Sequence, residues 1–375
     1  MIQIREVDCR REQKRFIAFP DELYKGNPYY VPALRMDERK IFSKNYLYLD
    51  TCEAVYFNAY KDGKMVGRIS GIIQKAANEK NNEKRVRFTR FDVIDDFEVA
   101  QALVKAVADW ALSKGMNTVC GPLGFSDLER EGLLIEGFDQ LSTFEEQYNA
   151  PYYGGFIERL GYSKEVDWTE SKITAPSDEE FEQLQQMKDF LFRRYKLRFG
   201  TAKNVKQWLS KYSDGLFEVL DKSYDGVYGT VPFTDGMKKL VIDNFALIIS
   251  LNFITVVVDE NDNVVLFGVT FPSIAKAVQR SRGRITPRFI WEVLKAKKNP
   301  EVIDLGLIGV DPQWLNRGIS AAVAAELAKM LRRPGVKYAE TNLNLEDNYA
   351  IQNLWHRFGR EDHKRRRAYV KKLND

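Results

Sequence analysis

The sequence predicts an α/β protein that contains two copies of one folding unit. At 375 residues the chain is long for a single domain, so two domains are the natural expectation. Short alternating apolar runs are followed by stretches with helical periodicity. These segments follow a similar order in both halves of the chain. We therefore predict one domain over residues 1–175 and a second over residues 176–375.

The first half is predicted to contain three strands before one long helix, and a further strand at residues 117–125 after it. Residues 53–73 are typical of a β-hairpin, because two alternating strands flank the dipeptide Asp62-Gly63. Residues 86–94 predict another strand, followed by a helix that Asp95 or Asp96 can cap. Residues 148–168 predict a turn, a short helix and a closing strand. The apolar face of the long helix comprises Val99, Leu103, Val107 and Trp110.

The second half repeats this pattern after a connecting helix. Residues 175–195 open with Pro176, Ser177 and acidic residues, which is a typical helix start. Residues 253–272 predict a hairpin around Asn261-Asp262. The segments after them predict a strand (301–310), a turn (311–320), an alanine-rich helix (321–331), a strand (336–345), a helix (348–358) and a closing strand (365–373).

Composition excludes several classes of function. The formal net charge is +4 with 29% charged residues, which is too balanced for a strongly basic nucleic-acid-binding protein. Cys9, Cys52 and Cys120 stand far apart, which argues against a zinc site or a disulfide framework. Only two histidines are available for metal binding or Ser-His-Asp chemistry. No apolar run reaches the roughly 18–20 residues of a spanning helix, so we expect a cytoplasmic protein without a metal cofactor.

The turn at residues 311–322 has the character of a phosphate-binding loop. An apolar strand ends at Asp311-Pro312, and Asn316, Arg317 and Gly318 precede an alanine-rich helix. Successive backbone N–H groups at a helix N-terminus favour an anion, and a glycine lets the anion approach the backbone closely. The alternative is an ordinary turn between a strand and a helix.

This loop, together with the strand order around it, resembles the GNAT superfamily of acyl-CoA-dependent N-acyltransferases. Its members bind the pyrophosphate of coenzyme A in a loop of the form Q/R-x-x-G-x-G/A. Leu315 takes the first position here and Ser320 the last, and both depart from that pattern. The resemblance implies two tandem GNAT-like domains, each a mixed, mostly antiparallel sheet flanked by helices. It implies acyl-CoA as cosubstrate, held by Ile308, Gly309, Val310, Asn316, Arg317, Gly318, Ile319 and Ser320.

The residues for the chemistry follow partly from the same resemblance. Asn348 holds the position of a family asparagine, but Trp355 stands where many members have a tyrosine that protonates the departing thiolate. Tyr349 and Tyr369 are the nearest substitutes in sequence. Glu340 is the first choice for general base, because Glu340, Asn342 and Asn344 alternate along one predicted strand. A structural salt bridge is the alternative for Glu340, and Glu346 and Asp347 are alternative bases.

The resemblance extends over nearly the whole chain to a tandem two-domain bacterial subfamily. Segments such as "GPLGFSDLEREGLLIEGFD" and "QYNAPYYGGFIERLGY" carry it. Some relatives are associated with N-acylation of long-chain sphingoid amines, which suggests a lipid-like amine acceptor.

The first domain is expected to lack a coenzyme A site. Asp95, Asp96 and Glu98 crowd the helix start at the equivalent point, where carboxylates repel a pyrophosphate. The irregular segment 121–155 is expected to shape an acceptor pocket instead, with a structural loop as the alternative. The predicted acceptor-binding residues are Glu136, Asp139, Tyr148, Asn149, Tyr152, Asn342 and Asn344.

The sequence therefore predicts an acyl-CoA-dependent N-acyltransferase that acts on a small-molecule or lipid-like amine, without a specific nucleic-acid partner. A non-catalytic acyl-CoA-binding scaffold and an aminoacyl-tRNA-dependent transferase are the alternatives. The basic cluster at residues 363–372 is either a solvated edge, a contact for the adenosine phosphate or a peripheral contact with anionic lipid. The oligomeric state does not follow from the sequence.

Overall fold

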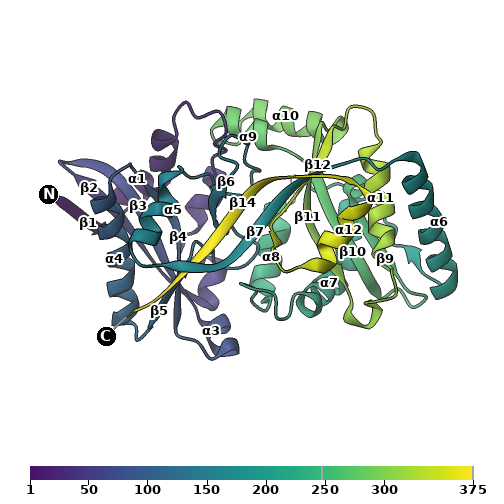
Figure 1. Ribbon diagram of the computed structural model, residues 1–375, viewed down its shortest axis with the longest axis horizontal. Helices are drawn as coiled ribbons and strands as arrows, with labels where there is room; N and C mark the ends of the chain where they lie inside the picture. Colours follow the sequence, from purple (N-terminus) through teal and green to yellow (C-terminus); the bar gives the residue numbers. More distant parts are fainter. Residues whose placement is uncertain (246–247, 374–375) are drawn as a thin grey trace.

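The two halves of the molecule share one continuous sheet. The computed structural model describes residues 1–245 and 248–373. Its 14 strands follow the order β1-β2-β3-β4-β5-β14-β7-β12-β11-β10-β9-β8, with β6 and β13 paired beside this path. Figure 1 shows the first half, mostly purple and blue, at one end and the second half, in teal, green and yellow, at the other. Strands β7 (Ser163–Thr174) and β14 (Gly359–Lys372) cross the middle and join them.

The first half has four antiparallel strands and a fifth strand that runs parallel to the fourth. The predicted hairpin at residues 53–73 is confirmed, and its turn residues Asp62 and Gly63 both have positive φ. The strands are β1 (Ile2–Glu6), β2 (Cys52–Lys61), β3 (Lys64–Gln74), β4 (Arg85–Val93), β5 (Thr118–Gly121) and β6 (Leu133–Glu136). The helices are α1 (Arg10–Leu23), α2 (Arg35–Lys40), α3 (Lys75–Asn81), α4 (Phe97–Ser113) and α5 (Tyr152–Arg159).

The second half repeats this arrangement after α6 (Asp178–Tyr195), which Ser177 and Glu180 begin with a capping box. The strands are β8 (Arg198–Phe199), β9 (Ile254–Val258), β10 (Val264–Pro272), β11 (Val302–Val310), β12 (Tyr338–Thr341) and β13 (Asn344–Leu345). The helices are α7 (Val205–Ser223), α8 (Asp235–Phe245), α9 (Ala275–Ser281), α10 (Pro287–Lys298), α11 (Ala321–Leu331) and α12 (Tyr349–Leu354). Within the described residues, no helix is long and apolar enough to cross a bilayer.

The closing strands are exchanged between the halves. The C-terminal strand β14 pairs with β5 of the first half, where Tyr369 lies opposite Gly121. Strand β7 closes the first half in sequence, yet it pairs with β12 of the second half, where Lys172 lies opposite Glu340. The predicted domain boundary at residue 175 falls between β7 and α6. Each half therefore completes its sheet with a strand from the other half.

The sheet opens within the second half, and this opening positions the candidate site. Strands β11 and β12 run parallel and pair from Val302 opposite Tyr338 to Leu305 opposite Thr341. Beyond this point β11 continues to Val310 beside β10, while no described strand pairs with its other edge. Along that edge residues 306–310 have no described strand partner, so backbone N–H groups there are available to a ligand, whereas the carbonyl oxygen of Ile308 accepts a hydrogen bond from Tyr224.

Candidate active site

A cavity of about 800 Å³ occupies the opening between β11 and β12. Its walls come from both halves of the chain. The first half contributes residues 127–129, 131, 145 and 146 from its loops and Trp168 from β7, and the second half contributes the rest. The second-half walls are formed by residues of α7, α8, β10, β11, the loop at residues 315–320, β12, β13 and α12.

The loop at residues 315–320 presents free backbone N–H groups beside this cavity. Asn316 and Gly318 have φ values of 64° and 74°. An added Cβ at Gly318 would meet no heavy atom within 4 Å, so the backbone is open on that side. The N–H groups of Gly318, Ile319 and Ser320 donate to no acceptor among the described residues. Since α11 begins at Ala321, the loop combines unpaired donors with a positive helix end, an arrangement that suits a pyrophosphate.

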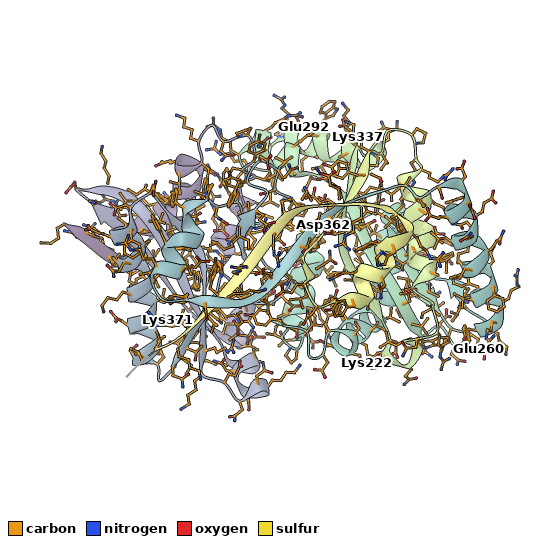
Figure 2. The ribbon with its side chains drawn as sticks, in the orientation of Figure 1. Lys222, Glu260, Glu292, Lys337, Asp362 and Lys371 are labelled. Carbon is orange, nitrogen blue, oxygen red and sulfur yellow. The ribbon has the colours of Figure 1, made fainter. Side chains whose placement is uncertain are left out.

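Two cations lie near this loop. Arg317 is exposed on the outer side, where its guanidinium lies 4.7 Å from the ring centre of Trp314 and 5.6 Å from that of Tyr195. Lys222 lines the cavity and appears at the lower edge of the second half in Figure 2. Its Nζ lies 3.5 Å from a carboxylate oxygen of Asp311. Arg317 therefore lies beside the loop but outside the cavity interior.

The residues of β11 that the resemblance implies would hold acyl-CoA also lie on the cavity wall. Ile308, Gly309 and Val310 all line the cavity. The hydroxyl of Tyr224 lines it too and donates a hydrogen bond of 3.2 Å to the carbonyl oxygen of Ile308. Burial is the main reason that the pKa of Tyr224 rises to about 12, so this phenol is neutral at physiological pH. The structure therefore places a neutral phenol beside Ile308, one of the residues predicted to hold acyl-CoA.

The first half contributes a group of buried and half-buried carboxyl groups to the cavity wall. The group comprises Asp127, Glu129, Glu131, Glu145 and Glu146. Glu131 is 4% exposed and Glu146 is 3% exposed. One carboxylate oxygen each of Asp127, Glu131 and Glu146 makes no hydrogen bond within the described residues. These buried acceptors face a cavity large enough for a ligand, and an ammonium or amine group would supply the missing donors.

Burial raises the pKa values of Asp127, Glu131, Glu145 and Glu146 to different degrees. It raises the pKa of Asp127 to about 6. It raises the pKa of Glu146 to about 8, although Arg366 opposes this effect. The pKa values of Glu131 and Glu145 are also raised well above the ordinary range. At neutral pH Asp127 is therefore the member best matched to accept a proton, since its pKa lies just below the working pH.

Apolar side chains form another part of the cavity. They come from one face of α7 and from the end of α8. An aliphatic chain that enters this part would lose contact with water at about 25 cal/mol per Å² of buried apolar area. The residues are Trp208, Leu209, Leu216, Phe217, Val241, Ile242 and Phe245.

Glu340 does not lie on the cavity wall. Its carboxylate is buried and accepts a hydrogen bond from Lys364, and His363 Nε2 lies 3.2 Å from it. Burial would raise the pKa of Glu340, but Lys364 outweighs it and the pKa is lowered. A carboxylate held in this way lacks the free lone pair and the raised pKa of a general base. The geometry favours the salt-bridge alternative for Glu340.

The polar strand predicted around Glu340 is interrupted. Strand β12 ends at Thr341, and β13 begins at Asn344. The prediction that Glu340, Asn342 and Asn344 alternate along one continuous strand is therefore wrong. Thr341 and Leu343 line the cavity together with Asn342 and Asn344. The break occurs where β12 loses β11 as its partner.

The other predicted catalytic residues occupy different environments. Asn348 lines the cavity, and its side chain caps α12 by accepting a hydrogen bond of 3.2 Å from the N–H of Ile351. Tyr349 is exposed and does not line the cavity. Trp355 is buried against the core and also lines the cavity, and its Nε1 has no hydrogen-bond partner in the described part of the chain.

Five predicted acceptor-binding residues lie outside this cavity. Glu136 and Asp139 are exposed. Asn149 bonds both backbone groups of Leu134, and Tyr148 packs beside it in a small apolar cluster. The hydroxyl of Tyr152 donates to the carbonyl oxygen of Val93. The segment 121–155 does reach the cavity, but it does so through the carboxylates of residues 127–146.

In the first half the equivalent opening is filled. Strands β4 and β5 separate after Arg87, as β11 and β12 do later in the chain. The hydroxyl of Tyr153 accepts a hydrogen bond of 2.7 Å from the N–H of Val93, at the end of β4. The side chain of Asp96 accepts bonds from the first N–H groups of α4. The N–H group at the end of β4 and the first N–H groups of α4 are therefore already hydrogen-bonded within the protein, whereas the corresponding N–H groups of the loop before α11 have no acceptor in the part of the chain that the structure describes.

The basic cluster at residues 363–372 is mostly occupied by ion pairs. Lys364 and Arg366 are fully buried and bind Glu170. Arg365 and Arg367 both bind the buried Asp167. These charges hold β14 to β7 and are not free for a ligand.

Comparison with known proteins identifies relatives of similar length. No protein-family model matches the sequence. The chain is 27% identical over 377 residues to Protein YghO of Escherichia coli strain K12, which covers 97% of this chain and 94% of that protein. It is 25% identical over 385 residues to the bacterial ceramide synthase of Caulobacter vibrioides, with coverage of 98% and 96%.

Solved structures share the fold at low sequence identity. A tandem GNAT protein from the clavulanic acid biosynthesis pathway superposes with a TM-score of 0.55 at 12% identity, over 100% of this chain and 99% of that one. A GCN5-related N-acetyltransferase from Sphaerobacter thermophilus superposes with a TM-score of 0.52 at 13% identity, over 100% and 96%. These likenesses confirm the fold predicted from the sequence. Together with the ceramide synthase, they support acyl transfer as the class of chemistry.

Proposed function

Because the chain has the fold of the tandem GNAT proteins, we propose that it is an acyl-CoA-dependent N-acyltransferase. One observation carries the proposal: a single cavity joins the loop at residues 315–320 to the carboxyl groups of residues 127–146. The first feature suits the pyrophosphate of coenzyme A, and the second suits an amine. An acyl donor and an amine acceptor would thus meet between the two halves.

The residues of the second half fit coenzyme A. The open backbone at Gly318 and the unpaired N–H groups of Ile319 and Ser320 would hold its pyrophosphate. Acyl-CoA supplies an activated acyl group as a thioester. The free edge of β11 at Ile308, Gly309 and Val310 would stabilise negative charge on the thioester oxygen through a backbone N–H.

The carboxylates of the first half would orient the acceptor and take its proton. The amine nitrogen forms a bond to the acyl carbon, the carbon–sulfur bond breaks, and the amine loses a proton. Asp127 is the proposed acceptor of that proton, because it is ionised at neutral pH and has an unpaired oxygen. This assignment replaces Glu340 as the proposed base.

The phenol of Tyr224 is the proposed proton donor to the departing thiolate. Trp355 cannot donate a proton at neutral pH. Tyr224 is neutral, lines the cavity and lies against Ile308, where the thioester is expected. A proton from this side would leave coenzyme A as the free thiol.

The acceptor is proposed to be a long-chain amine. The apolar part of the cavity on α7 and α8 would bind the chain, while Asp127 and Glu131 would bind the amine. The relative named ceramide synthase supports this choice. The experiment compares kcat/KM for a long-chain amino alcohol, a polyamine and free amino acids, with thiol release as the readout. Preference for the long-chain amine is expected. Preference for small polar amines would contradict the acceptor class.

A further inference from the structure

The outward side of α10 carries large apolar side chains that are more than half exposed. Trp291 is 60% exposed and Leu294 is 56% exposed. They lie three residues apart, so they share one face of the helix. On the inward face Phe289 and Val293 are fully buried and fix the helix to the protein. Ile285, in the turn before the helix, is exposed as well.

Positive charge surrounds these apolar residues. Residues 276–298 contain eight Lys and Arg residues and one acidic residue, a net charge of +7 in a chain whose total is +4. The acidic residue is Glu292, which lies 3.2 Å from Arg288 and 3.5 Å from Arg280. In the described part of the chain no carboxylate pairs with the exposed cations Arg282, Arg284, Lys295 and Lys298.

We propose that this surface binds a bilayer that contains anionic lipid. We call it the α10 face and define it as Arg282, Arg284, Ile285, Arg288, Trp291, Leu294, Lys295 and Lys298. Tryptophan and leucine gain free energy in the headgroup region of a bilayer, where the long cationic side chains reach lipid phosphates. The sequence allowed a peripheral contact with lipid through residues 363–372. The buried ion pairs of that strand exclude it there, and the α10 face takes its place.

The position of α10 suits such contact. Helix α10 lies at the outer edge of the molecule, away from the strands at its centre (Figure 1). Glu292, which stands on this helix, is labelled at the same edge in Figure 2. A convex helix with apolar and cationic side chains on one face fits a flat anionic surface better than it fits a peptide groove.

A second exposed apolar pair shows that this combination is specific to α10. Phe190 on α6 is 51% exposed, and Met187 is exposed on the same helix. Helix α6 contains five acidic and three basic residues, so its net charge is −2. Charge complementarity to anionic lipid is therefore present at α10 and absent at α6.

The α10 face also adjoins the cavity. Lys297 Nζ donates a hydrogen bond of 2.9 Å to the carbonyl oxygen of Ile249, and Ile249 lines the cavity. Phe245, at the end of α8, lines the cavity and packs against the cluster that holds Phe289. A bilayer bound at α10 would therefore lie beside the apolar part of the cavity. The inference concerns membrane binding and does not depend on the proposed reaction.

The test is flotation of the full-length protein with two kinds of vesicle. One kind is pure phosphatidylcholine, and the other contains about 30% phosphatidylglycerol, which carries the negative surface charge that Lys and Arg recognise. We expect wild type to float with the anionic vesicles only. The double variants Trp291→Ser/Leu294→Ser and Lys295→Glu/Lys298→Glu should each weaken binding roughly tenfold or more.

Matched controls separate membrane binding from loss of folding. Phe190→Ser/Met187→Ser removes an exposed apolar pair from α6, 51% and 37% exposed, and Lys203→Glu/Lys206→Glu reverses two exposed charges near α7. Both controls should float like wild type, and thermal melting should show that all four variants fold.

A second readout locates the contact. Vesicles with brominated acyl chains should quench part of the tryptophan fluorescence of the wild-type protein. In the variant Trp291→Phe this quenching should be absent. The proposal is wrong if wild type stays with the unbound fraction on anionic vesicles. It is also wrong if the α10 variants float as well as wild type. Capture of an acidic protein by the α10 face without flotation would assign the surface to a protein partner instead.

Discussion

Lys364 Nζ lies 2.7 Å from Glu170 Oε2, and both side chains are fully buried. The pair joins β14 to β7, the two strands that are exchanged between the halves. Arg366 binds the same glutamate at 2.6 Å, and Lys364 also binds Glu340. The charges compensate one another where the sheet passes from one half to the other.

Removing the cation should destabilise the whole molecule. Lys364→Met leaves Glu170 and Glu340 buried with less compensation, so the free energy of unfolding should fall by about 3–5 kcal/mol. Urea unfolding measures the loss. As a control, Lys105→Met breaks an exposed pair with Asp109 and should cost less than about 1 kcal/mol. Equal effects of the two variants would show that the buried pair is not important for stability.

The same glutamate should make stability depend on pH. Burial would raise the pKa of Glu170, but Arg366 and Lys364 lower it to about 2 from an ordinary value of 4.5. Because the folded pKa is lower, the stabilisation is complete above about pH 4.5 and is lost as pH falls toward 2. The melting temperature should drop over this range, and less steeply in Glu170→Gln. An identical slope in the two proteins would contradict this account.

Coenzyme A should bind once per chain, at Gly318. Gly318→Glu places a carboxylate in the anion site and forces a side chain onto a positive φ, so binding should be lost. Gly335→Glu imposes the same strain at a position with φ of 90° and open space around it. That control should bind coenzyme A normally by calorimetry. A stoichiometry near two, or normal binding by Gly318→Glu, would contradict the assignment.

Asp127→Asn should slow turnover without weakening coenzyme A binding. Removal of a general base typically costs about 10²–10⁴ in rate. The wild-type rate should rise with pH through about 6, as Asp127 loses its proton, and this step should vanish in the variant. Asp139→Asn alters an exposed carboxylate off the cavity and serves as the control. A wild-type pH profile in Asp127→Asn would remove Asp127 from the mechanism.

The parts of the fold with local signals could be predicted from the sequence. The Asp62-Gly63 hairpin, the Ser177 helix start and the loop at Gly318 each depend on residues close together in the chain. The exchange of β7 and β14 has no such signal. Both segments are recognisable as closing strands, but the choice of partner depends on contacts about 200 residues apart. Helices α8 and α10 were not predicted.

The same limit applies to the candidate site. The sequence predicts that the segment 121–155 shapes an acceptor pocket and points to Glu136 and Asp139 in it, whereas the carboxyl groups that line the cavity include Asp127, Glu131, Glu145 and Glu146. An irregular loop has no periodicity that shows which side chains point inward. The available signal in the sequence is the occurrence of several acidic residues in a segment rich in glycine and aromatic residues.

The most direct test of the account is to look for the amide product. Purified protein is given acyl-CoA and an isotopically labelled long-chain amino alcohol, and the product is identified by mass spectrometry. The account predicts labelled amide in excess over enzyme from wild type, and none above background from Gly318→Glu. It would be contradicted if coenzyme A bound once per chain while the acyl group stayed on the thiol with every amine tested, because the chain would then be an acyl-CoA-binding protein without transferase activity.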